Sequence, residues 1–338
     1  MFYVGLDIHS RQITMCVLDE NGKLLQRAQV RTVAELESRL RSLPDRFEVC
    51  YEASCGYGHY HDVLSPLASR VVVAHPGQLR LIFRSKHKND RKDAEKLAKL
   101  LFLGEVPAVH VPTADVRAWR ELITCRRHLV EKRTVAKNGV RALLRSLGVS
   151  APPRPGLWTN RGVAWLRGLE LSAAPALRRD LLLEEIATLT RQIRRVETEL
   201  DRIGLVHPAV FQLMSIPGVG LRTAEAVVAF LDDPHRFPHS KAVGRYFGLV
   251  PVQDQSGRTN RLGHITREGS ATVRRFLTEA AWQAIRRSPS VRAFFERVQR
   301  QDPERKKIAI VATAHYLVRV MYALLRHGTL WKETVQAA

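Results

Sequence analysis

The stretch Asn89-Asp90-Arg91-Lys92-Asp93-Ala94-Glu95-Lys96 places two aspartates three residues apart within a run of basic side chains. Apolar residues with helical spacing follow, from Ala94 to Leu101. If Asp93 opens this helix, Asp90 and Asp93 lie about one turn apart and face the same way, so they can share a hard metal ion. The alternative is that Asp90 is a helix N-cap and Asp93 a first-turn acid favoured by the helix dipole.

Two further acids upstream favour the metal-binding interpretation. Asp7 and Glu52 each come at the end of a segment that reads as a buried strand. The segment order predicts three antiparallel strands and then alternating helix and strand, which is an α/β sheet of mixed direction. This order is typical of the RNase H-like superfamily, although actin-like kinases begin in a similar way. The expected strands are residues 2–7, 12–18, 24–30, 47–51 and 71–74, and the expected helices are residues 33–43 and 57–67.

The chain is strongly basic. Its 338 residues include 54 Lys and Arg against 33 Asp and Glu, for a formal net charge of +21 and an isoelectric point near 10.5. The excess is spread over expected helices and loops, so we expect extended nucleic acid as the partner and no membrane. The length predicts two domains and a connector.

A long basic helix is predicted over residues 116–147. Arg133, Lys137, Arg141 and Arg145 fall four residues apart and therefore line one side of it. Like charges at this spacing repel one another without a counter-anion. We therefore expect these side chains, together with Arg126, to contact phosphates.

A second long helix carries apolar residues that step by four and three. This spacing predicts a three-heptad coiled-coil seam. The seam can pair with the basic helix before a Pro-rich break at residues 151–156, or with a second subunit; we expect self-association. The seam residues are Leu182, Ile186, Leu189, Ile193, Val196, Leu200 and Ile203.

The C-terminal part holds two further candidate sites. Ile216-Pro217-Gly218-Val219-Gly220 resembles a helix-hairpin-helix element, in which Gly218 and Gly220 would let backbone N–H groups approach a DNA phosphate. A plain tight turn is the alternative. Residues 253–264 are expected to form a flexible loop in which Ser256, beside glycine and surrounded by arginines, is placed as a nucleophile would be.

Cysteine use and hydropathy do not favour a disulfide-stabilised, zinc-binding or membrane protein. Cys16, Cys50, Cys55 and Cys125 form no CxxC pair, so we expect core thiols in a reducing cytoplasm and no structural zinc. The apolar run at residues 308–325 contains His315 and Arg319, two of the side chains that favour a buried helix over a membrane span.

Six short motifs follow one another along nearly the whole chain. Together they resemble the insertion-sequence transposases that have an N-terminal RuvC-like domain and a C-terminal serine-bearing domain, also called bridge RNA-guided recombinases. Arg267 stands where lysine is commoner in that family. The motifs are Gly5-Leu6-Asp7, Tyr51-Glu52-Ala53-Ser54-Cys55-Gly56, Asp90-Arg91-Lys92-Asp93-Ala94, Ile216-Pro217-Gly218-Val219-Gly220, Gly248-Leu249-Val250-Pro251 with Ser256-Gly257, and Ile265-Thr266-Arg267-Glu268-Gly269.

The resemblance implies a mechanism and its partners. Asp7, Glu52, Asp90 and Asp93 would be the four acids of the RuvC-like site, and Ser256 would be the nucleophile. The implied partners are donor and target DNA, a structured guide (bridge) RNA that selects the DNA, and further copies of the chain in a dimer or tetramer. In such an oligomer the acids and the serine would meet across subunits.

The chemistry agrees with this picture. Four carboxylates in a basic protein favour Mg²⁺, which neutralises a phosphate oxygen during in-line displacement. With Ser256 as the attacking group, the phosphodiester is kept as a phosphoserine and can pass to another strand without ATP. Five arginines could clamp the phosphate or its neighbours: Arg258, Arg261, Arg267, Arg274 and Arg275.

Three other functions are compatible with parts of the sequence. A RuvC-like structure-specific nuclease would use the same acids with water as the nucleophile. An actin-like kinase would share the strand order and Asp7 but leaves the basic charge unexplained. A nucleic-acid scaffold would need none of the acids.

The expected architecture has three parts. Residues 1–112 form an α/β RNase H-like (RuvC-like) catalytic domain, and residues 113–206 form a helical coiled-coil middle. Residues 207–338 form a mainly α domain with the helix-hairpin-helix-like element and the serine. The expected location is the bacterial cytoplasm, in association with the nucleoid.

Overall fold

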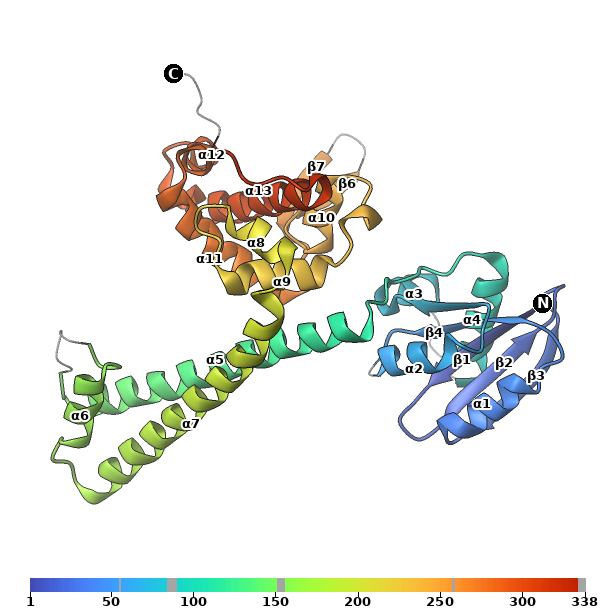
Figure 1. Ribbon diagram of the computed structural model, residues 1–338, viewed down its shortest axis with the longest axis horizontal. Helices are drawn as coiled ribbons and strands as arrows, with labels where there is room; N and C mark the ends of the chain where they lie inside the picture. Colours follow the sequence, from blue (N-terminus) through green and yellow to red (C-terminus); the bar gives the residue numbers. More distant parts are fainter. Residues whose placement is uncertain (55, 84–89, 151–155, 257–258, 334–338) are drawn as a thin grey trace. The chain divides into compact units, whose positions relative to one another are not determined.

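The computed structural model describes the chain except for residues 55, 84–89, 151–155, 257–258 and 334–338 (Figure 1). Most of the Pro-rich break, together with Cys55 and Arg258, therefore lies outside the described residues, as do the side chains of Asp90 and Ser256. The chain forms two compact units, Met1–Arg117 and Ala118–Ala338.

A five-stranded mixed sheet with the order β3-β2-β1-β4-β5 forms the centre of the N-terminal unit. The first three strands form the predicted antiparallel meander, while β4 runs parallel to β1 and β5 parallel to β4. The Asp19 carboxylate accepts hydrogen bonds from the backbone of Asn21 and Lys23 and so holds the turn between β2 and β3. The strands are β1 (Phe2–Ile8), β2 (Ile13–Leu18), β3 (Leu24–Val30), β4 (Phe47–Glu52) and β5 (Arg70–Ala74).

Helices cover both faces of this sheet. Val4, Leu6, Val49 and Tyr51 share a buried cluster with residues of α1 (Val33–Arg41) and α2 (Tyr57–Leu64) on one face. The alternate residue Cys50 packs on the other face with Leu79 of α3 (Pro76–Ile82) and with α4 (Asp90–Leu103). The arrangement confirms the predicted mixed α/β domain and is consistent with an RNase H-like fold; α3 was not predicted.

Helix α4 lies directly against β1 because Gly5 has no side chain. A Cβ at Gly5 would lie 2.0 Å from the carbonyl oxygen of Ala94 and 2.5 Å from the backbone nitrogen of Ala98. Glu95 bonds Lys99 and Arg27 of β3, and these hydrogen bonds hold the pKa of the Glu95 carboxyl below its usual range. The helix begins at Asp90, which differs both from a start at Asp93 and from an N-cap at Asp90, so both aspartates belong to its first turn.

Helix α5 (Ala114–Ser146), most of which belongs to the C-terminal unit, packs against a second long helix, α7 (Ala173–Gly204) (Figure 1). The short helix α6 (Asn160–Arg167), which was not predicted, shares their buried cluster. Gly139 of α5 faces Leu182 of α7, and Ile186, Leu189, Ile193 and Leu200 are buried. Because one chain already buries these seam residues, the seam lends no support to the expectation that it drives self-association.

The remaining helices form the largest core of the protein. Helix α13 (Lys306–His327) contacts α10, α11 and α12, and its apolar face is buried among them. Its length and composition would suffice to cross a membrane, but half of its most apolar window is buried inside the protein, as predicted for a core helix. The other helices are α8 (Pro208–Met214), α9 (Leu221–Leu231), α10 (Ser240–Tyr246), α11 (Ala271–Arg287) and α12 (Pro289–Gln299).

The segment that carries Ser256 is a β-hairpin, not the flexible loop that the sequence suggested. Strands β6 (Pro251–Ser256) and β7 (Thr259–Ile265) pair antiparallel, with Gln255 opposite Asn260 and Ser256 opposite Thr259. The described residues of β6 are exposed and mostly polar, so they lack the buried alternation by which strands are recognised.

The cysteine expectation holds in part. Cys16 and Cys50 are buried, and burial raises the pKa of their thiols to about 11 and about 12. Cys125 is exposed on α5, so the expectation of a core thiol is wrong there.

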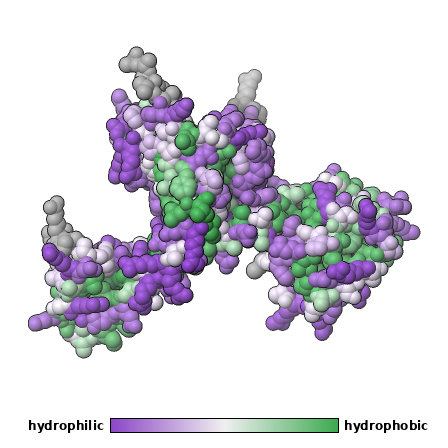
Figure 2. Space-filling model, viewed as in Figure 1, coloured by the Kyte–Doolittle hydropathy of each residue, from purple (hydrophilic) through white to green (hydrophobic). Residues whose placement is uncertain are grey.

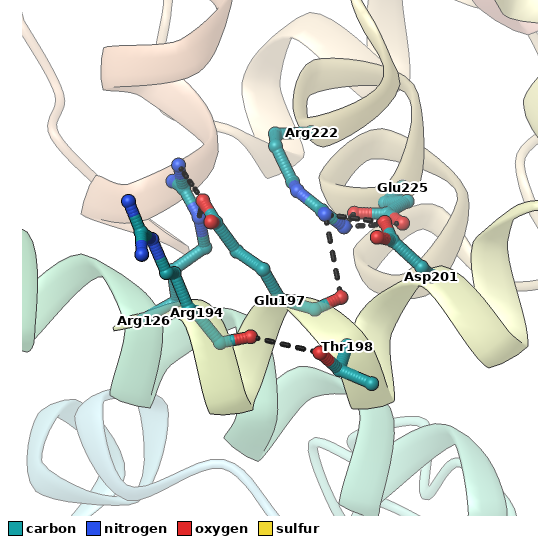
Figure 3. A network of polar contacts seen from close by, with 7 residues as sticks. All are labelled: Arg126, Arg194, Glu197, Thr198, Asp201, Arg222 and Glu225. Carbon is teal, nitrogen blue, oxygen red and sulfur yellow. Dashed lines mark hydrogen bonds and ion pairs between the residues drawn. The ribbon is translucent and has the colours of Figure 1, made fainter. Parts of the chain in front are cut away.

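An ionic network around the buried Glu225 joins α7 and α9, and a neighbouring ion pair joins α5 to α7 (Figure 3). Arg222 donates from Nη1 to both carboxylate oxygens of Glu225 at 2.9 Å and from Nη2 to Asp201. Glu225 is fully buried, which raises its pKa, and its carboxylate occupies the space that a Cβ at Gly204 would need. A separate ion pair between Arg126 and Glu197, 2.7 Å long, ties α5 to α7.

Replacing Arg222 with methionine is expected to lower the free energy of unfolding by about 3–5 kcal/mol, because Glu225 would keep a buried and uncompensated charge. Arg202→Met is the matched control, since Arg202 is 71% exposed and pairs only at the surface with Glu199; its expected cost is below about 1 kcal/mol. Urea unfolding of both variants measures the difference. Equal losses would contradict the structural role of the network.

Candidate active site

The register of the central strands brings Asp7 and Glu52 to the same end of the sheet. In the parallel pair β1 and β4, Gly5 lies beside Cys50 and Leu6 beside Tyr51, so Asp7 and Glu52 come one step further along. Gly5 and Cys50 both face α4. Side chains alternate along a strand, so Asp7 and Glu52 are directed to the α4 face as well.

Helix α4 carries Asp93 one residue before its contact with β1. Asp93 precedes Ala94, whose carbonyl lies over Gly5, two residues before Asp7 on the same face. Its carboxylate is 34% exposed and accepts a hydrogen bond of 2.8 Å from Lys96 Nζ. The Lys96 ammonium also lies 5.1 Å from the centre of the Phe83 ring. A cation that binds Asp93 would therefore compete with Lys96 for one carboxylate oxygen.

The described acids suit a hard cation in their chemistry. Carboxylate oxygens are the ligands that Mg²⁺ prefers. Asp7 is 18% exposed, so its carboxylate is partly screened from solvent yet accessible. Among the residues that the structure describes, no three His, Cys, Asp or Glu side chains are gathered closely enough to hold a metal ion. Asp90 is outside that comparison, so the four-acid site remains a prediction.

His9 is a neighbour of the acids that the sequence did not single out. Its Nε2 lies 3.1 Å from Oδ2 of Asp7. The only available signal was its position two residues after an acid that ends a strand. On a straight strand such residues share a face, and here the chain turns after Ile8 with the side chain of His9 still directed at Asp7.

Close backbone contacts anchor the base of the hairpin that carries Ser256, at Gly248 before β6 and at Gly269 after β7. A Cβ at Gly248 would lie 2.4 Å from the backbone nitrogen of Glu268, and one at Gly269 would lie 2.1 Å from the carbonyl oxygen of Tyr246. Both glycines have positive φ, so larger residues there would be strained as well as crowded. These contacts explain why glycines occupy the two motifs that flank the hairpin.

The Arg274 side chain binds the backbone at the base of this hairpin instead of pointing to solvent. Its Nη1 donates to the carbonyl oxygens of Phe247, Glu268 and Gly269. Burial, and then the nearby Arg267, lower the pKa of the Arg274 guanidinium. The sequence predicted that Arg274 binds nucleic acid, because the sequence shows its charge but not its contacts with backbone carbonyl oxygens.

The other arginines near the hairpin differ in their surroundings. Arg261 and Arg267 are exposed, and Arg267, at the base of the hairpin, has a positive φ of 58°. Arg275 is 50% exposed and forms ion pairs with Glu131 of α5 and Glu279, at 3.0 and 3.1 Å. Arg261 and Arg267 are thus better placed for phosphate than Arg274 or Arg275.

The basic face of α5 is partly used inside the chain. Lys137 and Arg141 lie 5.0 and 5.4 Å from the centre of the Trp158 ring, and burial, with Arg133 and Arg141 nearby, lowers the pKa of Lys137. Arg141 and Arg145 are exposed. Figure 2 shows mostly hydrophilic surface along the pair of long helices in the view drawn.

The glycines of the turn between α8 and α9 have different roles. Gly218 has a φ of +92°, and a Cβ there would lie 2.4 Å from the backbone nitrogen of Ala284 in α11. Packing therefore accounts for Gly218 without a ligand. Gly220 is the N-cap of α9, and open space surrounds the position of its absent side chain. Phosphate binding at this turn remains a prediction.

Comparison with known proteins gives two matches to families of transposases. Residues 4–148 match the DEDD transposase domain of the IS110 type. Residues 211–296 match the transposase IS116/IS110/IS902 family. The first match contains the sheet with its acids, and the second contains the turn at Gly218 and the serine hairpin.

The sequences of individual relatives are similar to this chain over most of its length. The transposase for insertion sequence element IS1111A of Coxiella burnetii is 27% identical over 285 residues, which cover 84% of this chain and 78% of the relative. The transposase for insertion sequence element IS1328 of Yersinia enterocolitica is 25% identical over 349 residues, which cover 98% of each protein.

Proposed function

We propose that this chain, which matches transposase families of the IS110 and IS116/IS110/IS902 types over residues 4–148 and 211–296, is a transposase of that family with a DEDD domain, and that it cuts and rejoins DNA with Mg²⁺ at the acids and a serine nucleophile. The proposed Mg²⁺ site rests on the strand register, which brings Asp7 and Glu52 to one end of the sheet beneath α4. The proposed metal ligands are Asp7, Glu52, Asp90 and Asp93. When bound there, Mg²⁺ would supply neutralisation of the phosphate charge that builds during displacement.

The proposed covalent step involves Ser256. Its Oγ attacks the phosphorus of a DNA phosphodiester, the bond from phosphorus to one deoxyribose oxygen breaks, and the serine proton ends on that leaving oxygen. A hydroxyl group of another strand then reverses the exchange, so no ATP is needed. The hairpin register places Ser256 opposite Thr259 at the end of β6, and the close backbone contacts of Gly248 and Gly269 fix the base of this hairpin.

A hydrolytic alternative uses the same acids. The DEDD domain fits a RuvC-like nuclease in which water attacks the phosphate and Ser256 has no chemical role. That enzyme would leave free DNA ends and no protein-linked DNA.

The partners follow from charge and family. Transposases act on DNA, and the net charge of +21 favours a polyanion. A structured guide RNA, assembly into a dimer or tetramer, and association with the nucleoid are further parts of the proposal.

The experiment that tests the function is DNA joining by the protein purified with its native nucleic acid. Donor and target DNA, Mg²⁺ and the co-purified RNA are combined, and joined products are sequenced. We expect joining that needs Mg²⁺ and is lost after RNase treatment. Joining that survives RNase would remove the guide RNA from the proposal, and cutting without joining would favour the nuclease.

A further inference from the structure

His9 lies in the turn between β1 and β2, next to the proposed metal site. Its backbone N–H donates to the carbonyl oxygen of Gln12 at 2.9 Å, which fixes the chain just after β1. From this anchored position its Nε2 reaches 3.1 Å from Oδ2 of Asp7. The side chain therefore reaches the acid from a backbone that this local turn holds in place.

The exposures of the two side chains show how they are arranged. His9 is 52% exposed, whereas Asp7 is 18% exposed. The imidazole therefore lies on the solvent side of the pair. A carboxylate oxygen accepts hydrogen bonds, so His9 can hold the Asp7 carboxylate by donating from the ring nitrogen that faces Oδ2.

We propose that His9 is a positioning residue that orients the Asp7 carboxylate for divalent-cation binding. This inference rests on the proposed function, since it assumes that Asp7 is a metal ligand. The physical reason is that a carboxylate at the end of a strand can rotate about its terminal bonds. A hydrogen bond to one oxygen removes part of that freedom before the cation arrives, and loss of such an outer contact typically costs about 10- to 100-fold in metal affinity.

The simpler alternative is a surface pair with no function. An exposed His–Asp pair contributes little to stability. It would also leave cation affinity unchanged. The two interpretations therefore differ in a quantity that can be measured without DNA.

The test is Mn²⁺ binding by the intact protein, followed by the electron paramagnetic resonance signal of free Mn²⁺, with Mg²⁺ as competitor. His9→Ala removes the donor, while His9→Gln keeps an N–H at a similar distance from the backbone. His59→Ala is the matched control, because His59 is an exposed histidine of α2 in the same unit. Asp7→Asn reports whether the metal site itself exists.

We expect His9→Ala to weaken Mn²⁺ binding by about 10- to 100-fold. His9→Gln should recover most of this loss, and His59→Ala should bind as the unaltered protein does. If His9→Ala binds normally while Asp7→Asn loses binding, the metal site stands and the role of His9 is wrong. If Asp7→Asn also binds normally, both the role of His9 and the proposed metal site fail.

Discussion

Replacing Ser256 with alanine is expected to abolish protein-linked DNA and to lower strand joining by about 10³-fold or more, because no other group would hold the phosphoryl intermediate. The covalent species is measured by denaturing gel electrophoresis of end-labelled DNA. The modified peptide is then identified by mass spectrometry.

Thr259→Val is the matched control for the serine variant. Thr259 lies opposite Ser256 in the hairpin register, so its replacement perturbs the same two strands without removing the proposed nucleophile. We expect Thr259→Val to retain most joining. Wild-type joining by Ser256→Ala would show that the serine is not the nucleophile, and unchanged cutting with free ends would support hydrolysis.

Replacing Asp7 or Asp93 with asparagine is expected to reduce cutting and joining together, by about 10³-fold. Loss of a metal that stabilises the transition-state charge costs several kcal/mol, and each 1.36 kcal/mol corresponds to about tenfold in rate. Asparagine has nearly the same size as aspartate, so the fold should be kept. Single-turnover cutting of labelled DNA measures the effect.

Glu95→Gln provides the control for the acid variants. Glu95 is also an acid of α4, but its carboxylate bonds Lys99 and Arg27 instead of facing the strand end with Asp7. We expect this variant to lose some stability and to cut DNA at nearly the normal rate per folded molecule. An equal loss of activity in Glu95→Gln and Asp93→Asn would point to damage of α4 and not to a missing ligand.

The strand order of the sheet was predictable because local signals and tertiary structure agree there. Apolar strands and helical spacing indicated the same order, and the positions of Asp7 and Glu52 follow from the ends of the predicted strands. The start of α4 was harder, because residues 89–93 are polar and charged and give no apolar period. The role of Gly5 in seating α4 could be seen only once the helix was placed on the strand.

The C-terminal unit was less predictable for related reasons. Strand β6 is exposed and polar, so its hairpin looked like a loop. The apolar spacing of α7 predicted a packing seam but did not show which helix packs against it. In the structure that helix is α5 of the same chain. Charge alone could not distinguish Arg274, which binds backbone carbonyls, from the exposed Arg261. Contacts between distant residues decide these roles.

We propose above that the acids at the end of the sheet hold the metal. Iron-directed backbone cleavage tests it most directly: Fe²⁺ replaces Mg²⁺ in the intact protein, ascorbate and peroxide are added, and the cut sites are mapped by mass spectrometry. The predicted result is cutting near Asp7, Glu52 and Asp93 that excess Mg²⁺ suppresses and Asp7→Asn abolishes. Cutting elsewhere in the chain, or none that Mg²⁺ suppresses, would show that these acids do not hold the metal.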